Sequence, residues 1–384
     1  MIELLAQSAA VAFIAAWLMI HYVREKSFNS TPALPRVDGK PGGKVSIILP
    51  VRNELAYIHD SVRTLLSLDY VEKEVIVVDD NSTDGTWEVV EKMAVEDLFV
   101  VRVVGDEEGW MGKCRACHIG YLHSRGEWLL FTDADTDFAP TVLKDAVQAA
   151  EAFGLDFLSL YPRFRFRSFL HRAAMPVLLT GFYLFGKPHL VHSGRSAFAF
   201  GSFMLFRRGA YEKIGGHTAV RDALLEDRAL ALHARSHGLR MGLFRALDRV
   251  TASWNDDSRS LWNGMLRIFM PLGIISPVKT LSVFITLTAI CLLIPVLNIL
   301  AGSYLLLTTG YVVAGAVVGW EARRHAASFL NGLLWPIGVA AILAAAGTAF
   351  LKAWLNPTIR WRNRVYTVAR GELHEKIIFT SSCK

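Results

Sequence analysis

Cysteine is scarce in this sequence, and its scarcity argues against a small fold that is held together by disulfide bonds. Four cysteines occur in 384 residues, at positions 114, 117, 291 and 383. Four scattered thiols do not make a disulfide framework. Cys114 and Cys117 have the C-x-x-C spacing, but no second pair accompanies them, so we do not expect a zinc site. A thioredoxin-like redox pair is the alternative, although the flanking residues favour two cysteines inside an ordinary helix.

A clustered basic face is also missing. The formal net charge is +6, and the basic residues are not interleaved with the aromatic platforms that nucleic-acid binding requires. Much of the positive excess lies beside apolar segments, where anionic lipid headgroups attract Lys and Arg. We therefore expect a membrane surface, and no nucleic acid, as a partner.

Three long stretches lack Lys, Arg, Asp and Glu altogether, and 52% of all residues are hydrophobic. The first stretch, Leu4 to Val23, is long enough to cross a bilayer. Arg24 and Lys26 follow it and no basic residue precedes it, so a cleaved signal peptide is not expected. We predict an uncleaved anchor, with the domain that follows it in the cytoplasm.

The second uncharged stretch, Thr280 to Gly319, predicts a two-helix hairpin that turns near residues 298–303. Residues 321–325 (Glu-Ala-Arg-Arg-His) then predict a cytoplasmic loop, and residues 329–351 form a further apolar segment. Because no charged residue interrupts these segments, nothing marks an ion path, and a transporter is disfavoured.

The tail raises a conflict of sidedness. Four complete spans would place it outside the cell, yet Arg360, Arg362 and Arg364 favour the cytoplasm by the positive-inside rule. Either the segment 329–351, broken by Pro336, is re-entrant, or the rule fails here. The first reading is favoured.

These observations predict a multi-pass protein of the cell (inner or plasma) membrane. We divide the chain into an anchor (1–26), a linker (27–43), a soluble domain (44–260), an interfacial helix (261–279), C-terminal membrane helices (280–355) and a basic tail (356–384).

The soluble domain alternates strand and helix patterns. Strands are predicted at 45–50, 74–79, 98–104 and 128–131, with helices at about 55–66, 83–93 and 112–123. The run at 74–79 is almost continuously apolar and β-branched, as expected of a parallel strand buried on both faces. The alternation predicts a doubly wound α/β domain.

Carboxylates follow two of these strands. Asp133 and Asp135 come directly after residues 128–131, and Asp79 and Asp80 end another strand. In open α/β sheets, ligands bind in the crevice at the carboxyl ends of the strands. Hard oxygen ligands there suit Mg²⁺ or Mn²⁺. The alternative is a solvated Asp-x-Asp turn that caps the next helix.

Five motifs occur in the order known from one family: Val45–Glu54, Val77–Thr86, Gly109–Lys113, Phe131–Asp135 and Leu225–Asp227. With them the chain resembles the inverting glycosyltransferases of family 2, which have the GT-A fold, over about residues 44–260. The Gly-Trp-Met-Gly-Lys element and the apolar ends are similar to the branch that glycosylates lipids such as ceramide, hopanoids or carotenoids.

The resemblance implies a donor site for a nucleotide sugar. Side chains that line its nucleoside pocket would be Pro50, Arg52, Glu54, Asp79 and Asp80. Asp133 and Asp135 would hold a divalent ion, Mg²⁺ or Mn²⁺, against the diphosphate, and Lys113 would face phosphate from a glycine-flanked helix start. Strand-end caps and a solvated lysine are the alternatives.

Inverting transfer needs a base for the acceptor hydroxyl, and Asp227 is the candidate, with an ordinary helix N-cap as the alternative. Glu226 is taken as a positioning residue. Where many relatives carry an Arg-Trp pair, this chain has Leu261-Trp262. Arg259 then remains to clamp the diphosphate and Trp262 to contact the acceptor, unless both are interfacial anchors. This departure argues against processive polymer synthesis.

We therefore expect transfer of a single sugar, with inversion, to a hydroxyl of a membrane lipid of the carotenoid, hopanoid, ceramide or glycerolipid type. Two alternatives stay open: transfer to a polyprenyl phosphate, and a non-catalytic membrane protein that retains the domain. Aromatic residues after Tyr161 predict either an apolar acceptor wall or an interfacial helix pair.

Overall fold

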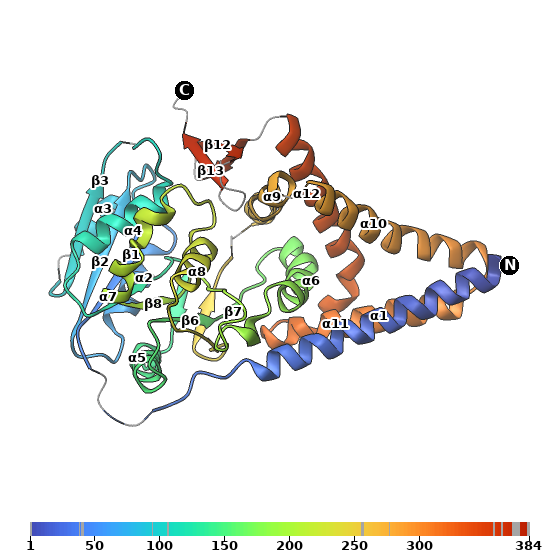
Figure 1. Cartoon of the computed structure of the whole chain (residues 1–384), viewed down its shortest axis with the longest axis horizontal. Coiled ribbons are helices and arrows are strands. Elements are labelled where there is room, and N and C mark those ends of the chain that lie inside the picture. Colours follow the sequence, from blue (N-terminus) through green and yellow to red (C-terminus); the bar gives the residue numbers. More distant parts are fainter. Residues whose placement is uncertain are drawn as a thin grey trace.

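The structure is a computed structural model. It describes residues 2–37, 39, 42–93, 95–105, 107–254, 257–275, 277–355, 358–361, 364–370 and 377–381. Side chains beyond Thr358, and some side chains between residues 272 and 293, lie outside this description. A mixed α/β domain and a group of long apolar helices make up the described chain (Figure 1).

A seven-stranded sheet forms the centre of the α/β domain. Its strand order is β3-β2-β1-β4-β8-β6-β9. The strands are β1 (Val45–Val51), β2 (Lys73–Asp80), β3 (Leu98–Val103), β4 (Trp128–Phe131), β6 (Phe157–Tyr161), β8 (Met204–Arg207) and β9 (Met241–Arg245). All neighbours are parallel except at β8, which runs antiparallel to β4 and β6. The four predicted strands are confirmed, and the sheet is mixed because of β8.

Two apolar cores cover the two faces of the sheet. Along β1, Ile47 belongs to one core and Ile48 to the other, because successive strand side chains point to opposite faces. Seven helices belong to this domain: α2 (Ile58–Leu66), α3 (Thr86–Glu91), α4 (Gly112–Leu122), α5 (Val142–Ala152), α6 (Phe169–Phe185), α7 (Arg208–Lys213) and α8 (Glu226–Ser236). Burial on both faces explains the unbroken apolar run of β2.

Two predicted boundaries are corrected. We predicted a helix from about residue 83, but α3 begins only at Thr86, whose N–H donates to Asp84 Oδ1 at 3.0 Å. We predicted that the first strand ends at residue 50, but β1 continues to Val51. The Ile48 carbonyl accepts from Thr132 on the β4 side, so the nitrogen of Pro50 faces the same side beyond the end of β4, where no strand partner requires an N–H.

Smaller elements complete the chain. One small sheet has the order β5-β10-β7, formed by β5 (Thr136–Phe138), β10 (Val250–Ala252) and β7 (Arg163–Phe164). The other contains β11 (Thr358–Trp361), β12 (Arg364–Arg370) and β13 (Ile377–Ser381). Short 3₁₀ turns are η1 (Pro188–Leu190), η2 (Gly216–Val220) and η3 (Phe329–Leu334).

Three long helices project together from the domain: α1 (Ile2–Ser30), α10 (Pro277–Leu300) and α11 (Tyr304–Arg324). The N-terminus lies at their far end (Figure 1). The predicted hairpin is confirmed, because α10 ends at Leu300 and α11 begins at Tyr304. By length and composition, three helical stretches among the described residues are apolar enough to cross a membrane: Glu3–Ser30, Tyr304–Arg324 and Phe329–Leu355.

Helix α12 (Trp335–Leu355) has a different direction. It crosses the base of the projecting helices and packs against α6 and α9 (Ser258–Ile275) (Figure 1). The segment changes from the 3₁₀ turn η3 to α12 between Leu334 and Trp335, and Pro336 lies in the first turn of α12, where the missing N–H costs nothing. The re-entrant reading of this segment stays a prediction, which the crossing direction supports.

The region predicted as a cytoplasmic loop is the end of a helix. Glu321 to Arg324 belong to the last turn of α11, and Glu321 is fully buried. Arg324 Nη1 donates to Glu321 Oε2 at 2.9 Å, and Arg24 Nε lies 3.7 Å from the same oxygen. The prediction failed because the partners of these charges are on α1, about three hundred residues earlier.

The segment expected to be a linker is also structured in part. Residues 27–30 are the last turn of α1. Ala33 then pairs with Arg245 at the edge strand β9, with Arg245 N–H donating to Pro32 O at 2.7 Å and Leu34 N–H donating to Arg245 O at 2.9 Å. The chain therefore adds to the edge of the sheet before it enters β1.

Candidate active site

The loops after β1 and β2 form one wall at the carboxyl edge of the sheet. Val51 and Asp79 lie side by side at the ends of their strands. Backbone groups of one loop bind side chains of the other: Asn53 N–H donates to Ser82 Oγ at 2.9 Å, and Glu54 N–H donates to Thr86 Oγ1 at 2.9 Å. These bonds explain why the sequence needs small hydroxyl residues in the second loop.

Asp79 carries an incomplete set of hydrogen bonds. Its side chain is fully buried, and Oδ2 accepts from Ser82 N–H at 3.2 Å. Oδ1 has no partner among the described residues. A buried carboxylate oxygen without a donor is costly. Asp79 is therefore suited to accept from a ligand N–H or hydroxyl.

Arg52 and Asp80 hold each other beside it. Arg52 Nη1 donates to the carbonyl oxygen of Asp80 at 2.7 Å and lies 3.5 Å from its Oδ2. Pro50 and Glu54 lie on the same segment as Arg52. The structure thus brings together the five residues that we predicted for the nucleoside pocket.

A second group gathers where α4, the β4 loop and α8 meet. Lys113 Nζ lies 2.6 Å from Asp133 Oδ1 and 2.5 Å from Glu226 Oε1. Asp227 lies beside them, and its Oδ2 accepts from Gly201 N–H at 3.2 Å. Four predicted residues from three distant segments therefore meet. We call Lys113, Asp133, Glu226 and Asp227 the acidic cluster.

Gly201 is a site residue that the sequence analysis did not single out. A Cβ atom at this position would lie 3.2 Å from Asp133 Oδ2 and 3.3 Å from Lys113 Nζ. The close approach is possible because the turn before β8 brings the backbone against the acidic cluster. Strand β8 then begins at Met204.

The charges of the acidic cluster shift one another. Burial, and then the charge of Glu226, raise the pKa of Asp227 to about 6. Burial alone would lower the pKa of Lys113, but Asp133 and Glu226 outweigh it and hold that pKa well above its usual range. Of the side chains in the cluster, Lys113 alone is cationic, so negative charge is left in excess.

Asp135 lies one residue beyond Ala134 on the same loop and is half-buried. Its carbonyl oxygen accepts from Ser253 N–H at 3.0 Å. The described residues contain no group of three or more His, Cys, Asp or Glu side chains placed to hold a metal ion. Mg²⁺ commonly uses only one or two carboxylates together with substrate phosphates, so Asp133 and Asp135 fit a metal that arrives with a diphosphate.

Helix α9 explains the departure at Leu261. This side chain is fully buried in a core of the domain, where an arginine would lack a partner. Trp262 is half-buried and packs against a separate apolar cluster that includes Met111 and Leu224. These two residues lie just before Lys113 and Glu226 in the chain. Arg259 is exposed in the first turn of α9. The structure thus brings Trp262, but not Arg259, into contact with the surroundings of the site.

Cys114 and Cys117 are free and buried inside α4. Burial raises the pKa of both thiols well above its usual range. A reactive thiol needs a lowered pKa and exposure, so the structural reading of the C-x-x-C spacing is confirmed over the redox reading.

The aromatic residues after Tyr161 do not share one surface: Phe164 and Phe166 line a cavity, Phe185 is exposed, and the acceptor wall stays a prediction. Tyr183 is buried in the domain core, and the Phe182 ring packs at 5.5 Å from that of Tyr161. They lie on α6, a single helix that packs against α12.

Comparison with known proteins agrees with this geometry. Residues 46–215 match the family described as Glycosyl transferase family 2. The chain is 26% identical over 233 residues to 4,4'-diaponeurosporenoate glycosyltransferase of Staphylococcus haemolyticus, covering 59% of this chain and 60% of that protein. It is 33% identical over 132 residues to undecaprenyl-phosphate 4-deoxy-4-formamido-L-arabinose transferase of Shewanella sediminis, covering 33% of this chain and 39% of that protein. The chain thus matches less than two thirds of the length of each of these relatives.

Among solved structures, the mannosyltransferase PcManGT from Pyrobaculum calidifontis, in complex with GDP-Man and Mn²⁺, has a TM-score of 0.55 at 21% sequence identity. The likeness covers 93% of this chain and 100% of that one, and it shows a shared fold. The motifs, the mixed sheet and the family match agree. Residues 46–215 are therefore similar to glycosyl transferase family 2, and the described chain has a GT-A type fold.

Proposed function

We propose that this protein transfers one sugar from a nucleotide-sugar donor to a hydroxyl of a membrane lipid, with inversion at the anomeric carbon. The observation that carries the proposal is the acidic cluster, in which Asp227 lies next to Lys113 and Asp133. Two relatives are named for lipid acceptors, a carotenoid acid and undecaprenyl phosphate. The long apolar helices beside the domain support an acceptor within the bilayer.

The donor base and ribose are assigned to the wall after β1 and β2. Asp79 Oδ1, which lacks a partner among the described residues, is suited to accept from a base N–H or a ribose hydroxyl. Pro50, Arg52, Glu54 and Asp80 border this position. Arg259 is assigned to the diphosphate only as a prediction, since its side chain is exposed.

The diphosphate is assigned to the side of the acidic cluster. Asp133 and Asp135 would hold Mg²⁺ or Mn²⁺, which when bound neutralises the leaving diphosphate as a Lewis acid. The excess negative charge of the cluster favours such a cation. Lys113 already lies against Asp133, at 2.6 Å, and from there an ammonium can reach phosphate oxygens.

Asp227 is assigned as the base. With a pKa of about 6 it is ionised at neutral pH and can accept the proton of the acceptor hydroxyl. Gly201 N–H binds Asp227 Oδ2, and Arg228 N–H binds Oδ1 at 2.7 Å, so the carboxylate is held in one orientation. Glu226 positions Lys113, and Trp262 is assigned to the acceptor side.

The domain is proposed to lie on the cytoplasmic face. Arg24 and Lys26 near the end of α1, and Arg323 and Arg324 at the end of α11, all lie at the domain ends of their helices (Figure 1). The positive-inside rule places such ends in the cytoplasm. Protease added to inside-out membrane vesicles should therefore cleave the domain, whereas protease added to intact spheroplasts should not.

The test of the reaction uses the full chain in detergent with labelled nucleotide sugars, a divalent ion and membrane lipid extract. We expect a labelled lipid that disappears in Asp227→Asn, while donor binding persists. Asp248→Asn, which changes an exposed carboxylate, is the control. Retained turnover of Asp227→Asn with a polyprenyl phosphate would favour that alternative, because this acceptor is already anionic. Donor binding without any transfer would favour the non-catalytic alternative.

A further inference from the structure

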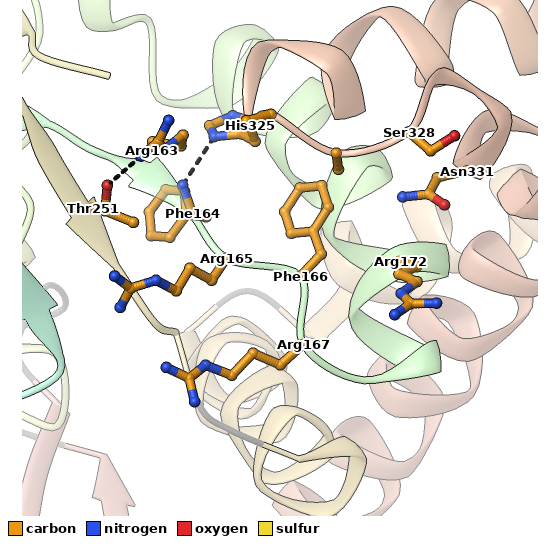
Figure 2. Close-up of a pocket in the computed structure, with 12 residues that line it drawn as sticks. Arg163, Phe164, Arg165, Phe166, Arg167, Arg172, Thr251, His325, Ser328 and Asn331 are labelled. Atoms are coloured by element: carbon orange, nitrogen blue, oxygen red, sulfur yellow. Dashed lines mark hydrogen bonds between the residues drawn. The ribbon is translucent and has the colours of Figure 1, made fainter. Parts of the chain in front are cut away.

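A cavity of about 570 Å³ lies where the domain meets the long helices. Its lining comes from the β7–α6 segment, from β10 and from the connection between α11 and η3 (Figure 2). Among the described residues that line it are four arginines, Arg163, Arg165, Arg167 and Arg172, and no Asp or Glu. The cavity is therefore strongly cationic, and it is distinct from the acidic cluster.

Two of the four arginines, Arg163 and Arg172, form no ion pair with any residue that the structure describes. Arg165 pairs with Asp137, which lies outside the lining, and Arg163 Nη2 donates to the neutral Thr251 Oγ1 at 3.0 Å. Arg172 is exposed in the first turn of α6 and forms no ion pair with any residue that the structure describes. Burial, and then the charge of Arg167, lower the pKa of Arg165. Like charges gathered in this way favour an anionic ligand.

The cavity has a fixed wall on the membrane side. His325 is buried, its Nδ1 accepts from Phe164 N–H at 3.0 Å, and its Nε2 lies 3.3 Å from Glu321 Oε1. Nδ1 therefore joins the end of α11 to β7, while Nε2 contacts a carboxylate of α11 itself. Ser328 and Asn331 on the next turn supply neutral hydrogen-bonding groups to the lining (Figure 2).

Apolar side chains next to the lining residues are exposed. Phe169 follows the arginine segment with 57% of its surface exposed, and Leu330, beside Asn331, has 67% exposed. A cationic cavity with apolar neighbours, at the base of helices long enough to cross a bilayer, matches a ligand that has an anionic head and apolar chains.

We propose that this cavity binds the phosphate of an anionic phospholipid headgroup and so fixes the domain against the bilayer surface. Guanidinium groups bind phosphate oxygens through paired, charge-assisted hydrogen bonds. Asn331 and Ser328 can bind the glycerol or ester oxygens. None of these residues belongs to the acidic cluster, although Arg165 is close enough to Asp135 for their charges to interact.

Free phosphate shares the charge of a headgroup, so the test compares both. The full chain in neutral detergent is titrated with dioctanoyl phosphatidylglycerol, dioctanoyl phosphatidylcholine and inorganic phosphate. We expect phosphatidylglycerol to bind at least about ten-fold more tightly than either of the others, because headgroup charge and chains both contribute.

The variants are Arg172→Gln and the double variant Arg163→Gln/Arg172→Gln. Arg172→Gln removes an exposed group without an ion pair among the described residues, so it should fold normally and weaken binding about three-fold, and the double variant about ten-fold or more. Arg63→Gln, on the exposed side of α2, makes the same charge change away from the cavity and should bind like the parent.

Three outcomes would overturn the proposal: equal binding of the two phospholipids, equal binding of inorganic phosphate, or unchanged binding in folded variants of both kinds. Nucleotide binding is measured in parallel. Its persistence in the cavity variants separates failure of this site from failure of the donor site.

Discussion

Two clusters of charged side chains in this molecule have similar composition but differ in the balance of positive and negative charge. At the inner ends of α1 and α11, Arg24 and Arg324 face Glu25 and Glu321, two charges of each sign. In the acidic cluster, Lys113 faces three carboxylates. A balanced buried cluster joins segments, whereas an unbalanced one at the edge of a sheet is ready to receive a charged ligand. The balance of charges within each cluster, rather than its burial, distinguishes the structural cluster from the candidate active site.

The largest expected effect comes from breaking the balanced cluster. Glu321→Gln removes the buried carboxylate that faces Arg24 and Arg324, which leaves Glu25 as the carboxylate of the cluster, and should lower the free energy of unfolding by about 3 kcal/mol. Denaturant unfolding of the full chain in detergent measures this loss. Glu25→Gln, at a partly exposed carboxylate, is the matched control, with an expected loss of about 1 kcal/mol or less. An unchanged denaturant midpoint in Glu321→Gln would show that the cluster does not stabilise the fold.

Removing the cation of the unbalanced cluster should affect function more than folding. Lys113→Gln leaves Asp133, Glu226 and Asp227 without their ammonium, and we expect turnover to fall about 100-fold, with weaker donor binding. The pKa of Asp227 should rise, because Lys113 lowers it in the parent. Steady-state kinetics and nucleotide titration measure both. Wild-type kinetics in Lys113→Gln would remove this residue from the site.

The pH dependence of turnover tests the unbalanced charge of the acidic cluster. A base with a raised pKa of about 6 loses its charge as the pH falls through that value, so turnover should fall about ten-fold for each unit below it and level off above it. The rate is measured between pH 5 and 8 at saturating donor, with about as many points below the expected pKa as above it. A profile that breaks near 4 would mean that Asp227 has an ordinary carboxyl pKa in the working enzyme.

The smallest effect is expected from a single methyl group. Gly201→Ala places a Cβ 3.2 Å from Asp133 Oδ2, tighter than ordinary contact, and the neighbours must shift. We expect turnover to fall about five-fold, roughly 1 kcal/mol, with little change in stability. Gly209→Ala is the control, because no atom lies within 4 Å of the added Cβ there. Equal kinetics in the two variants would contradict the close approach at Gly201.

Much of the site was predictable, because its residues follow local patterns. The apolar strand runs place Asp79 and Asp133 at one sheet edge, and a helix start places Asp227. Gly201 escaped, since its importance comes from side chains 68 and 25 residues away in the chain, those of Asp133 and Glu226. The burial of Glu321 and the arginine cavity were not predicted for the same reason. A charged stretch is expected to be exposed unless its partners, which are distant in the sequence, are known.

One consequence concerns the first residues of the chain. Residues 32–34 cover the open edge at β9, and Arg24 supplies the counter-charge for Glu321 in a helix of the opposite end of the sequence. A shortened protein that starts at β1 would therefore lose an edge protector and a buried counter-ion together, and unpaired strand edges promote self-association. The amino-terminal helix and the residues that follow it are thus part of what keeps the α/β domain folded and protected from self-association.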